Sequence, residues 1–376
     1  MNPRVLAIPG SLIRQIAARK RPESVDLGLG EPTLRPSNAH FEYAMRHILD
    51  RGVKYAPNAG IPELRDAIAR HYSYPGMNAR DNVCITAGSQ EAMYVALMTL
   101  LDPARDELLV VEPAFPSYVK MAALDGVACR SVTMSADEGF AFDAERILAG
   151  VGDSTRAIVI CSPCNPTARV LARDQAERLV RGLERRGGEP VWLIHDEIYR
   201  EQTFIDDAAY LAQRYPYTIV TNSVSKSNAL TGLRLGWILG PQTFVAQAIK
   251  AHAWVTSCTD TFAQQVALHV FSTPGGLREH SGWYAQQRAH VAATLDECAL
   301  PYAPIEGSFY ACVRLPEDMT SLDASNELIE RHNVVAIPGI AFGAALEGWL
   351  RLSWVAPLDQ VREGINRISQ YTNVSP

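Results

Sequence analysis

Hydrophobic positions form two different patterns along the first three quarters of the chain. Five short runs are apolar without alternation, as expected for strands buried on both faces. They are Val83–Thr86, Glu107–Val111, Arg156–Cys161, Val191–His195 and Thr218–Asn222. Around them, apolar residues recur with helical spacing in Glu63–Tyr72, Gln90–Leu101, Arg173–Arg185, Phe244–Trp254 and Phe262–Phe271. Strands that alternate with helices predict an α/β region with a mainly parallel sheet.

The pattern changes near residue 276, where strands and helices cease to alternate regularly. The spacing predicts helices at Leu277–Leu295, Ser321–His332 and Leu358–Tyr371 and strands at Ser308–Val313, Val334–Ile337 and Trp349–Trp354. This mixture predicts a smaller α+β domain. We expect the N-terminal residues to pack with it, because they precede the first regular α/β unit. The expected division is residues 46–275 for a large domain, and residues 1–45 with 276–376 for a small one.

Composition narrows the class of protein. The chain has 376 residues, 47% hydrophobic and 20% charged, which is ordinary for a globular protein. The formal net charge of −6 offers no basic surface for nucleic acid. Seven cysteines without framework spacing predict a reduced, cytoplasmic setting, and no apolar stretch predicts a membrane span. The lone Cys161-x-x-Cys164 has no second pair beside it, so we predict no metal site.

Chemically distinctive residues follow each of the five predicted strands. Ligands of open α/β sheets bind beyond the carboxyl ends of the strands. In chain order these residues are Gly88-Ser89-Gln90, Phe115, Asn165, Asp196 with Tyr199, and Ser223-Val224-Ser225-Lys226. Each alone could be an ordinary cap, turn or core residue. Their order after successive strands favours a single site for an anionic, aromatic cofactor that carries a carbonyl group.

One part of this set is suited to a phosphate group. A helix that starts at a Gly-Ser turn offers free backbone N–H groups and the positive end of its dipole. Hydroxyl and guanidinium donors would complete the binding of such an anion. The candidate residues are Ser89, Gln90, Ser223, Ser225 and Arg234.

The other part is suited to an aromatic ring. Phe115 offers a flat face for stacking. Asp196 would keep a pyridine nitrogen protonated, which makes the ring an electron sink. Tyr199 and Asn165 would donate hydrogen bonds to a ring oxygen. Lys226 would form a Schiff base with the carbonyl group and later move a proton.

These motifs resemble those of the pyridoxal-phosphate-dependent class I/II aminotransferases, which have the aspartate aminotransferase fold. The most specific one is Ser-x-Ser-Lys, followed after seven residues by Arg-x-Gly-Trp, at 223–237. Asn165-Pro166-Thr167 and Asp196-Glu197-Ile198-Tyr199 accompany it, and the resemblance extends to Arg351-Leu352-Ser353-Trp354. It implies an α/β fold: a large cofactor-binding domain with a mixed, mostly parallel sheet flanked by helices, plus a smaller α+β domain formed by both ends of the chain.

The resemblance also implies roles for the cofactor-binding residues. Lys226 would hold pyridoxal 5′-phosphate as a Schiff base, and Asp196 would pair with its pyridine nitrogen. Tyr199 and Asn165 would bind its 3′ oxygen, and Phe115 would stack on its ring, where the family often has Trp or Tyr. The residues that match the phosphate site are Ser89, Gln90, Ser223 and Arg234, with Ser225 assisting.

Three further residues gain a role from the resemblance alone. Arg351 matches the arginine that binds the substrate α-carboxylate, and Gly30 would line the same spot with Asn165. Tyr55 matches a tyrosine that reaches the phosphate of the neighbouring subunit. The resemblance therefore implies a homodimer with shared active sites.

The expected function is transfer of an amino group from an L-amino acid to a 2-oxo acid such as 2-oxoglutarate. Phe115, in place of a larger, hydrogen-bonding aromatic residue, leaves an apolar space and favours a broad range of donors, with neutral or aromatic ones preferred. The same fold hosts β-lyases, cyclases and other non-transaminating enzymes that share these residues, so this alternative stays open. The acidic net charge disfavours a DNA-binding sensor that uses the fold without catalysis.

Overall fold

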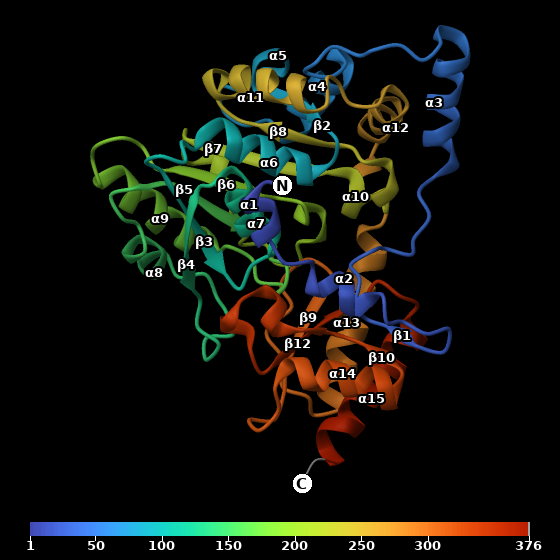
Figure 1. Ribbon diagram of the computed structural model, residues 1–376. Helices are drawn as coiled ribbons and strands as arrows, with labels where there is room; N and C mark the ends of the chain where they lie inside the picture. The colour runs from blue at the N-terminus through green and yellow to red at the C-terminus, as the bar shows by residue number, and fades with distance from the viewer. Residues whose placement is uncertain (375–376) are drawn as a thin grey trace.

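A seven-stranded sheet organises the larger part of the molecule (Figure 1), in a computed structural model that describes residues 1–374. Its strand order is β2-β8-β7-β6-β5-β3-β4, and only β8 runs antiparallel to its neighbours. The bounds are β2 (Val83–Thr86), β3 (Glu107–Glu112), β4 (Ala128–Thr133), β5 (Thr155–Cys161), β6 (Trp192–Asp196), β7 (Thr218–Ser223) and β8 (Gly236–Leu239). The prediction of a mixed, mostly parallel sheet is confirmed.

Helices cover both faces of this sheet, which explains the apolar runs of its strands. Alternate residues of β3 enter different cores: Leu108 and Val110 pack into one cluster, and Leu109 and Val111 into another. The surrounding helices are α4 (Pro62–Tyr72), α5 (Ala79–Asn82), α6 (Ser89–Leu100), α7 (Ser117–Asp125), α8 (Ala144–Ala149), α9 (Arg173–Arg185), α10 (Val224–Ser227), α11 (Gln242–Val255) and α12 (Thr261–Ser272). Burial on both faces removes the alternation that a half-exposed strand would show.

A smaller region, orange and red in Figure 1, follows α12. An antiparallel sheet of order β11-β12-β9 forms its centre, and β1 pairs in parallel with β10 beside it. The strands are β1 (Val25–Asp26), β9 (Tyr310–Arg314), β10 (Val334–Val335), β11 (Ile337–Pro338) and β12 (Trp349–Ser353). The helices are α13 (Ser281–Glu297), α14 (Ser321–His332) and α15 (Leu358–Val374).

The N-terminal residues contact both regions. Helix α1 (Pro3–Ala7) packs on α7, α2 (Leu12–Ala17) packs on β11, and α3 (Asn38–Arg51) packs on α12. Residues 45 and 46 both lie within α3, so a division into domains at 46 and 276 remains a proposal. Short 3₁₀ helices complete the chain: η1 (Arg200–Gln202), η2 (Leu211–Gln213), η3 (Thr231–Leu233), η4 (Gly276–Arg278), η5 (Gly339–Phe342) and η6 (Ala344–Leu346).

Two strands of the large sheet are absent from the sequence-based prediction. Strand β4 lies at the sheet edge and exposes most of its side chains, so it lacks an apolar run. Strand β8 is four residues long and fully buried. The predicted strand Val334–Ile337 is divided at Ala336 into β10 and β11, which belong to different sheets.

Parallel pairing places the carboxyl ends of β5, β6 and β7 side by side. Cys161 is the register partner of Asp196, and Asp196 is the partner of Thr221. The residues that follow these strands therefore meet at one edge of the sheet, facing the smaller region. Among the helices of residues 1–374, none combines the length and the apolar character needed to cross a membrane.

Candidate active site

Lys226 lies in α10, directly beyond the end of β7. Its Nζ donates a hydrogen bond to the carbonyl oxygen of Gly30 at 2.6 Å. Gln202 Nε2 and Tyr284 Oη donate to the carbonyl oxygen of Lys226 at 3.1 and 3.0 Å, which fixes its backbone. Burial lowers the pKa of Lys226 to about 8, and Glu31 nearby partly opposes this shift. At pH 7 the amine is then still mostly charged, but its neutral fraction is far larger than that of an ordinary lysine.

Asp196 is the last residue of β6 and is almost fully buried. Tyr118 Oη donates to its Oδ2 at 2.7 Å, and the backbone N–H of Ile198 donates to its Oδ1 at 3.2 Å. Burial raises the pKa of Asp196 above its ordinary value, although both hydrogen bonds favour the charged form. A cationic partner would stabilise a carboxylate that is buried in this way.

Arg351, on β12, is also buried and has unused hydrogen-bonding capacity. Its Nη1 donates to Asn165 Oδ1 at 3.3 Å and its Nη2 donates to the carbonyl oxygen of Gly28. Its Nε has no hydrogen-bond partner within residues 1–374. The guanidinium lies 4.3 Å from the centre of the Tyr310 ring. An unpartnered buried donor on a planar guanidinium is suited to a carboxylate ligand.

The start of α6 offers free hydrogen-bond donors that would suit an anion. No side chain caps this helix, so its first N–H groups stay available. A Cβ added at Gly88 would lie 2.5 Å from Arg234 Nη2, and Gly88 has a φ of +84° that favours glycine. Ser223 pairs with Gly236, and a Cβ at Gly236 would lie 2.6 Å from the backbone nitrogen of Ser89. Arg234, Ser89 and Ser223 are thus brought together.

The other predicted residues lie around these groups. Tyr199 is buried, and its Oη lies 3.0 Å from Tyr310 Oη. Phe115 is half-buried, with its ring edge to face against Tyr118. Gln90 is exposed and donates to Ser117 Oγ at 3.1 Å, and the Oγ of Ser223 accepts from the N–H of Ser225 at 3.0 Å. Tyr55 lies outside this group with 92% of its surface exposed.

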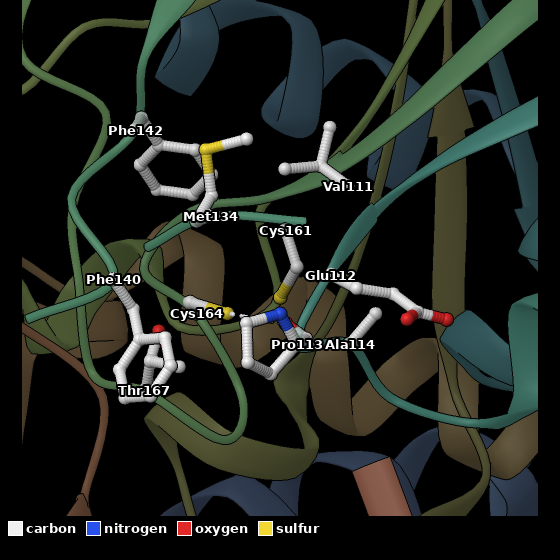
Figure 2. Close-up of a pocket in the computed structure, with 10 residues that line it drawn as sticks. All are labelled: Val111, Glu112, Pro113, Ala114, Met134, Phe140, Phe142, Cys161, Cys164 and Thr167. Atoms are coloured by element: carbon white, nitrogen blue, oxygen red, sulfur yellow. Dashed lines mark hydrogen bonds between the residues drawn. The ribbon is translucent and has the colours of Figure 1, made fainter. Parts of the chain in front are cut away.

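Cys161, the last residue of β5, and Cys164 line a void of about 10 Å³ (Figure 2). The space holds about one water molecule, which excludes an organic ligand. The Cys161 thiol donates to the carbonyl oxygen of Pro163 at 3.2 Å, and the Cys164 thiol donates to that of Pro113 at 3.7 Å. Within the described chain, no three His, Cys, Asp or Glu residues are grouped as metal ligands.

Comparison with known proteins decides the family. The model of the family described as aminotransferase class I and II matches residues 22–368. The chain belongs to this family. An aspartate aminotransferase of Pyrococcus horikoshii is 32% identical, over 98% of this chain and 96% of that protein.

Two further aminotransferases show the same similarity. Aromatic-amino-acid aminotransferase 2 of Thermococcus litoralis is 29% identical, over 92% of this chain and 91% of that protein. The solved structure of the Thermus thermophilus aspartate aminotransferase with maleate superposes with a TM-score of 0.90 at 27% identity, covering 98% and 99% of the two chains. The chain is therefore a transferase of the aminotransferase class, and its cofactor is pyridoxal 5′-phosphate.

The polar groups of the site fit this cofactor. The uncapped start of α6 and Arg234 offer donors to a phosphate. Asp196, raised in pKa by burial, would be stabilised by a protonated ring nitrogen. Lys226 offers an amine whose pKa is lowered toward the range in which it can attack a carbonyl carbon.

Sequence reasoning missed two tyrosines that contact predicted site residues. Tyr118 follows Phe115 by three positions, where the chain passes from β3 into α7, and this closeness in sequence could have indicated a shared role. Tyr310 lies in a predicted strand far along the chain, and no local signal connects it with Tyr199. Only the packing of the smaller region on the sheet brings these two residues together.

The buried amine has a consequence for stability. In the cofactor-free protein, Lys226→Met should raise the free energy of unfolding at pH 7 by up to about 3 kcal/mol, because the folded wild type must bury a charge. An unfolded lysine has a pKa of about 10.4, so this advantage should shrink as pH rises from about 8 to about 10.5. Denaturant unfolding across this pH range measures it.

Lys250→Met is the matched control, since Lys250 is exposed on α11. It should change the free energy of unfolding by less than about 0.5 kcal/mol at every pH. Equal stability of wild type and Lys226→Met at pH 7 would show that the amine is not buried as described.

Proposed function

We propose that this aminotransferase moves the amino group of an L-amino acid with a neutral or aromatic side chain to a 2-oxo acid such as 2-oxoglutarate. Lys226 is the residue that bonds covalently to the cofactor. The observation that carries the proposal is the burial of the Lys226 amine, with a pKa of about 8, at the sheet edge that also holds Asp196. When bound, pyridoxal phosphate supplies an electron-withdrawing ring and a reactive carbonyl carbon.

In this proposal the protein residues bind, orient and move protons. Lys226, once free, accepts the Cα proton of the donor, for which its lowered pKa is suited. Asp196 keeps the ring nitrogen protonated, and Tyr199 and Asn165 donate to the 3′ oxygen. The phosphate is bound by the start of α6 with the side chains of Ser89, Gln90, Ser223, Ser225 and Arg234.

Arg351 orients the donor. Its buried guanidinium is held by Asn165 and by the Gly28 carbonyl, and a planar guanidinium can bind a carboxylate through two parallel hydrogen bonds. Gly30 lies against Tyr310 and accepts from Lys226, so it lines the space between the amine and the arginine. This arrangement would place the donor α-carboxylate at Arg351 and its Cα near Lys226.

A cavity of about 750 Å³ next to Phe115 supports the preference for neutral or aromatic donors. It extends from Arg234 along α7 and is covered by residues 9–13 of the N-terminal segment. Much of its wall is apolar, including Leu12, Ile13, Met121, Leu124, Ile340 and Ala341. Apolar walls bind large apolar side chains. Lys120 is a cationic residue on this wall.

We further propose a cytoplasmic homodimer in which Tyr55 reaches the cofactor phosphate of the partner subunit. Tyr55 and Trp254 each expose 92% of their surface, and Val53 and Val255 are exposed beside them. Hydrogen bonds from Thr261 to the Lys54 carbonyl and from Asn58 to the Ser257 carbonyl join these two segments. An exposed apolar surface of this kind is typical of an interface. All seven cysteines are free, which supports a reducing compartment.

The donor preference is tested with the cofactor-loaded protein and single L-amino acids, without an acceptor. Phenylalanine and leucine should shift the visible absorption band to shorter wavelength at least about tenfold faster than aspartate, because the cavity is apolar. Adding 2-oxoglutarate should restore the band. Lys226→Ala, the control, should show neither change. Release of pyruvate or ammonia without an acceptor would contradict transamination, and a faster response to aspartate would contradict the donor preference.

The shared site is tested by subunit complementation. Lys226→Ala and Tyr55→Asp chains, each with strongly reduced turnover alone, should regain activity when co-expressed, since one site of a mixed dimer then has both residues intact. Light scattering of the wild type should give twice the 41.3 kDa of one chain. A monomer, or a mixed dimer without regained activity, would rule out the contribution of Tyr55 from the partner.

A further inference from the structure

Tyr310 lies at the centre of the site and contacts three of its members. It belongs to β9, and only 2% of its surface is exposed. Its Oη lies 3.0 Å from Tyr199 Oη, and its ring lies under the Arg351 guanidinium, 4.3 Å from ring centre to guanidinium carbon. A Cβ added at Gly30 would lie 2.0 Å from the Tyr310 oxygen. No other tyrosine of the described chain contacts both Tyr199 and Arg351 in this way.

We propose that Tyr310 is a positioning residue that couples the two halves of the active site. Its hydroxyl strengthens the hydrogen bond that Tyr199 donates to the cofactor 3′ oxygen, and its ring orients Arg351 for the substrate carboxylate. This inference rests on the proposed function, in which Tyr199 and Arg351 have these tasks.

The proposed role of the Tyr310 hydroxyl follows from the number of protons that the two phenols can donate. A phenol has one proton and two acceptor lone pairs. When Tyr199 gives its proton to the 3′ oxygen, the 3.0 Å contact requires Tyr310 to be the donor to Tyr199. Successive hydrogen bonds polarise one another, so this donation makes Tyr199 a stronger donor. The other titratable groups that face the pair are Arg351 and Cys161.

Burial keeps both phenols protonated. It raises the pKa of Tyr199 and that of Tyr310 above the ordinary value, and the cation of Arg351 only partly opposes this for Tyr310. Both tyrosines therefore remain donors throughout the neutral range. A charged Tyr310, which could not donate to Tyr199, is excluded under these conditions.

The ring part follows from the packing of Arg351. Tyr310 and Phe342 lie 4.3 and 5.0 Å from the guanidinium carbon. Aromatic rings at these distances attract a guanidinium through their π-electrons and restrict its orientation. Strand pairing fixes the arrangement, because Tyr310 is the register partner of Ser353, two residues beyond Arg351 on β12. Loss of the ring would free the guanidinium to rotate.

Two substitutions separate the hydroxyl from the ring. Tyr310→Phe removes only the hydroxyl, and Tyr310→Leu removes both. Tyr215→Phe is the matched control, since it deletes a buried hydroxyl that donates to the Val191 carbonyl at 3.0 Å, outside the site. Tyr199→Phe and the double variant Tyr199→Phe/Tyr310→Phe complete a mutant cycle.

The first readout is the pH at which the visible absorption band of the cofactor-loaded protein is half converted, which we call the midpoint. A weaker hydrogen bond at the 3′ oxygen leaves more negative charge beside the nitrogen that joins Lys226 to the cofactor. Tyr310→Phe should therefore raise the midpoint. The expected shift corresponds to an increase of about threefold to tenfold in the proton affinity of that nitrogen. It should cause no further shift in the Tyr199→Phe background, because it acts through Tyr199. Tyr215→Phe should leave the midpoint unchanged.

The second readout is carboxylate binding, measured by calorimetry with 3-phenylpropionate and as the KM of the donor. Tyr310→Phe should change both by less than about twofold, because the ring remains. Tyr310→Leu should weaken both by about threefold or more, as Arg351 loses its support.

Three outcomes would overturn the inference. A midpoint that Tyr310→Phe leaves unchanged would show that the hydroxyl only packs, and an equal shift in the Tyr199→Phe background would show that it does not act through Tyr199. Unchanged carboxylate binding in Tyr310→Leu would refute the role of the ring. Failure of the proposed roles is distinguishable, because the wild type itself would then lack the visible band, or Tyr199→Phe alone would leave the midpoint unchanged.

Discussion

The parallel register of β5, β6 and β7 is the constraint on which the active site depends. Because Cys161, Asp196 and Thr221 are aligned across these strands, the segments that follow them leave the sheet at one edge. Asn165, Tyr199 and Lys226 reach the same space although the chain separates them widely. Strand β8, antiparallel between β7 and β2, brings Arg234 and the start of α6 to that edge. A shift of one register step would turn the strand side chains, such as that of Asp196, to the opposite face.

Burial gives this edge its chemistry. The smaller region covers the carboxyl ends of the strands, and the loss of water lowers the pKa of Lys226 and raises that of Asp196. The charged form of each residue is therefore costly to bury without a partner. A phosphorylated, protonated aromatic aldehyde offers a partner to both, and to the donors at the start of α6. The same exclusion of water would strengthen the proposed binding of a carboxylate by Arg351.

The sequence predicted the large sheet well because its strands are buried on both faces and read as apolar runs. Three predicted elements, α9, α14 and β2, have the bounds found in the structure, and eight others differ from it by one residue at one or both ends. Strand β4 escaped prediction because an exposed edge strand lacks that signal. The cofactor-binding residues could be proposed because they follow strands in order and match family motifs. Their roles are supported by the geometry of the site.

The contacts of Tyr118 and Tyr310 could not be predicted in the same way. Tyr310 depends on the docking of β9 against the large sheet, a long-range event without a local pattern. The apolar wall beside Phe115 likewise combines residues 9–13, α7 and Ile340, which come together only in the folded chain. These contacts join segments that lie far apart in the chain, which local motifs do not reveal.

The central claim is that Lys226 bonds to the cofactor, and borohydride reduction followed by peptide mass spectrometry tests it most directly. Reduction makes the bond between lysine and pyridoxal phosphate permanent, so that the modified peptide can be identified. The account predicts one phosphopyridoxyl group per chain, on the peptide that contains Lys226. A group on another lysine, or an unmodified Lys226 in protein that shows the visible band, would contradict it.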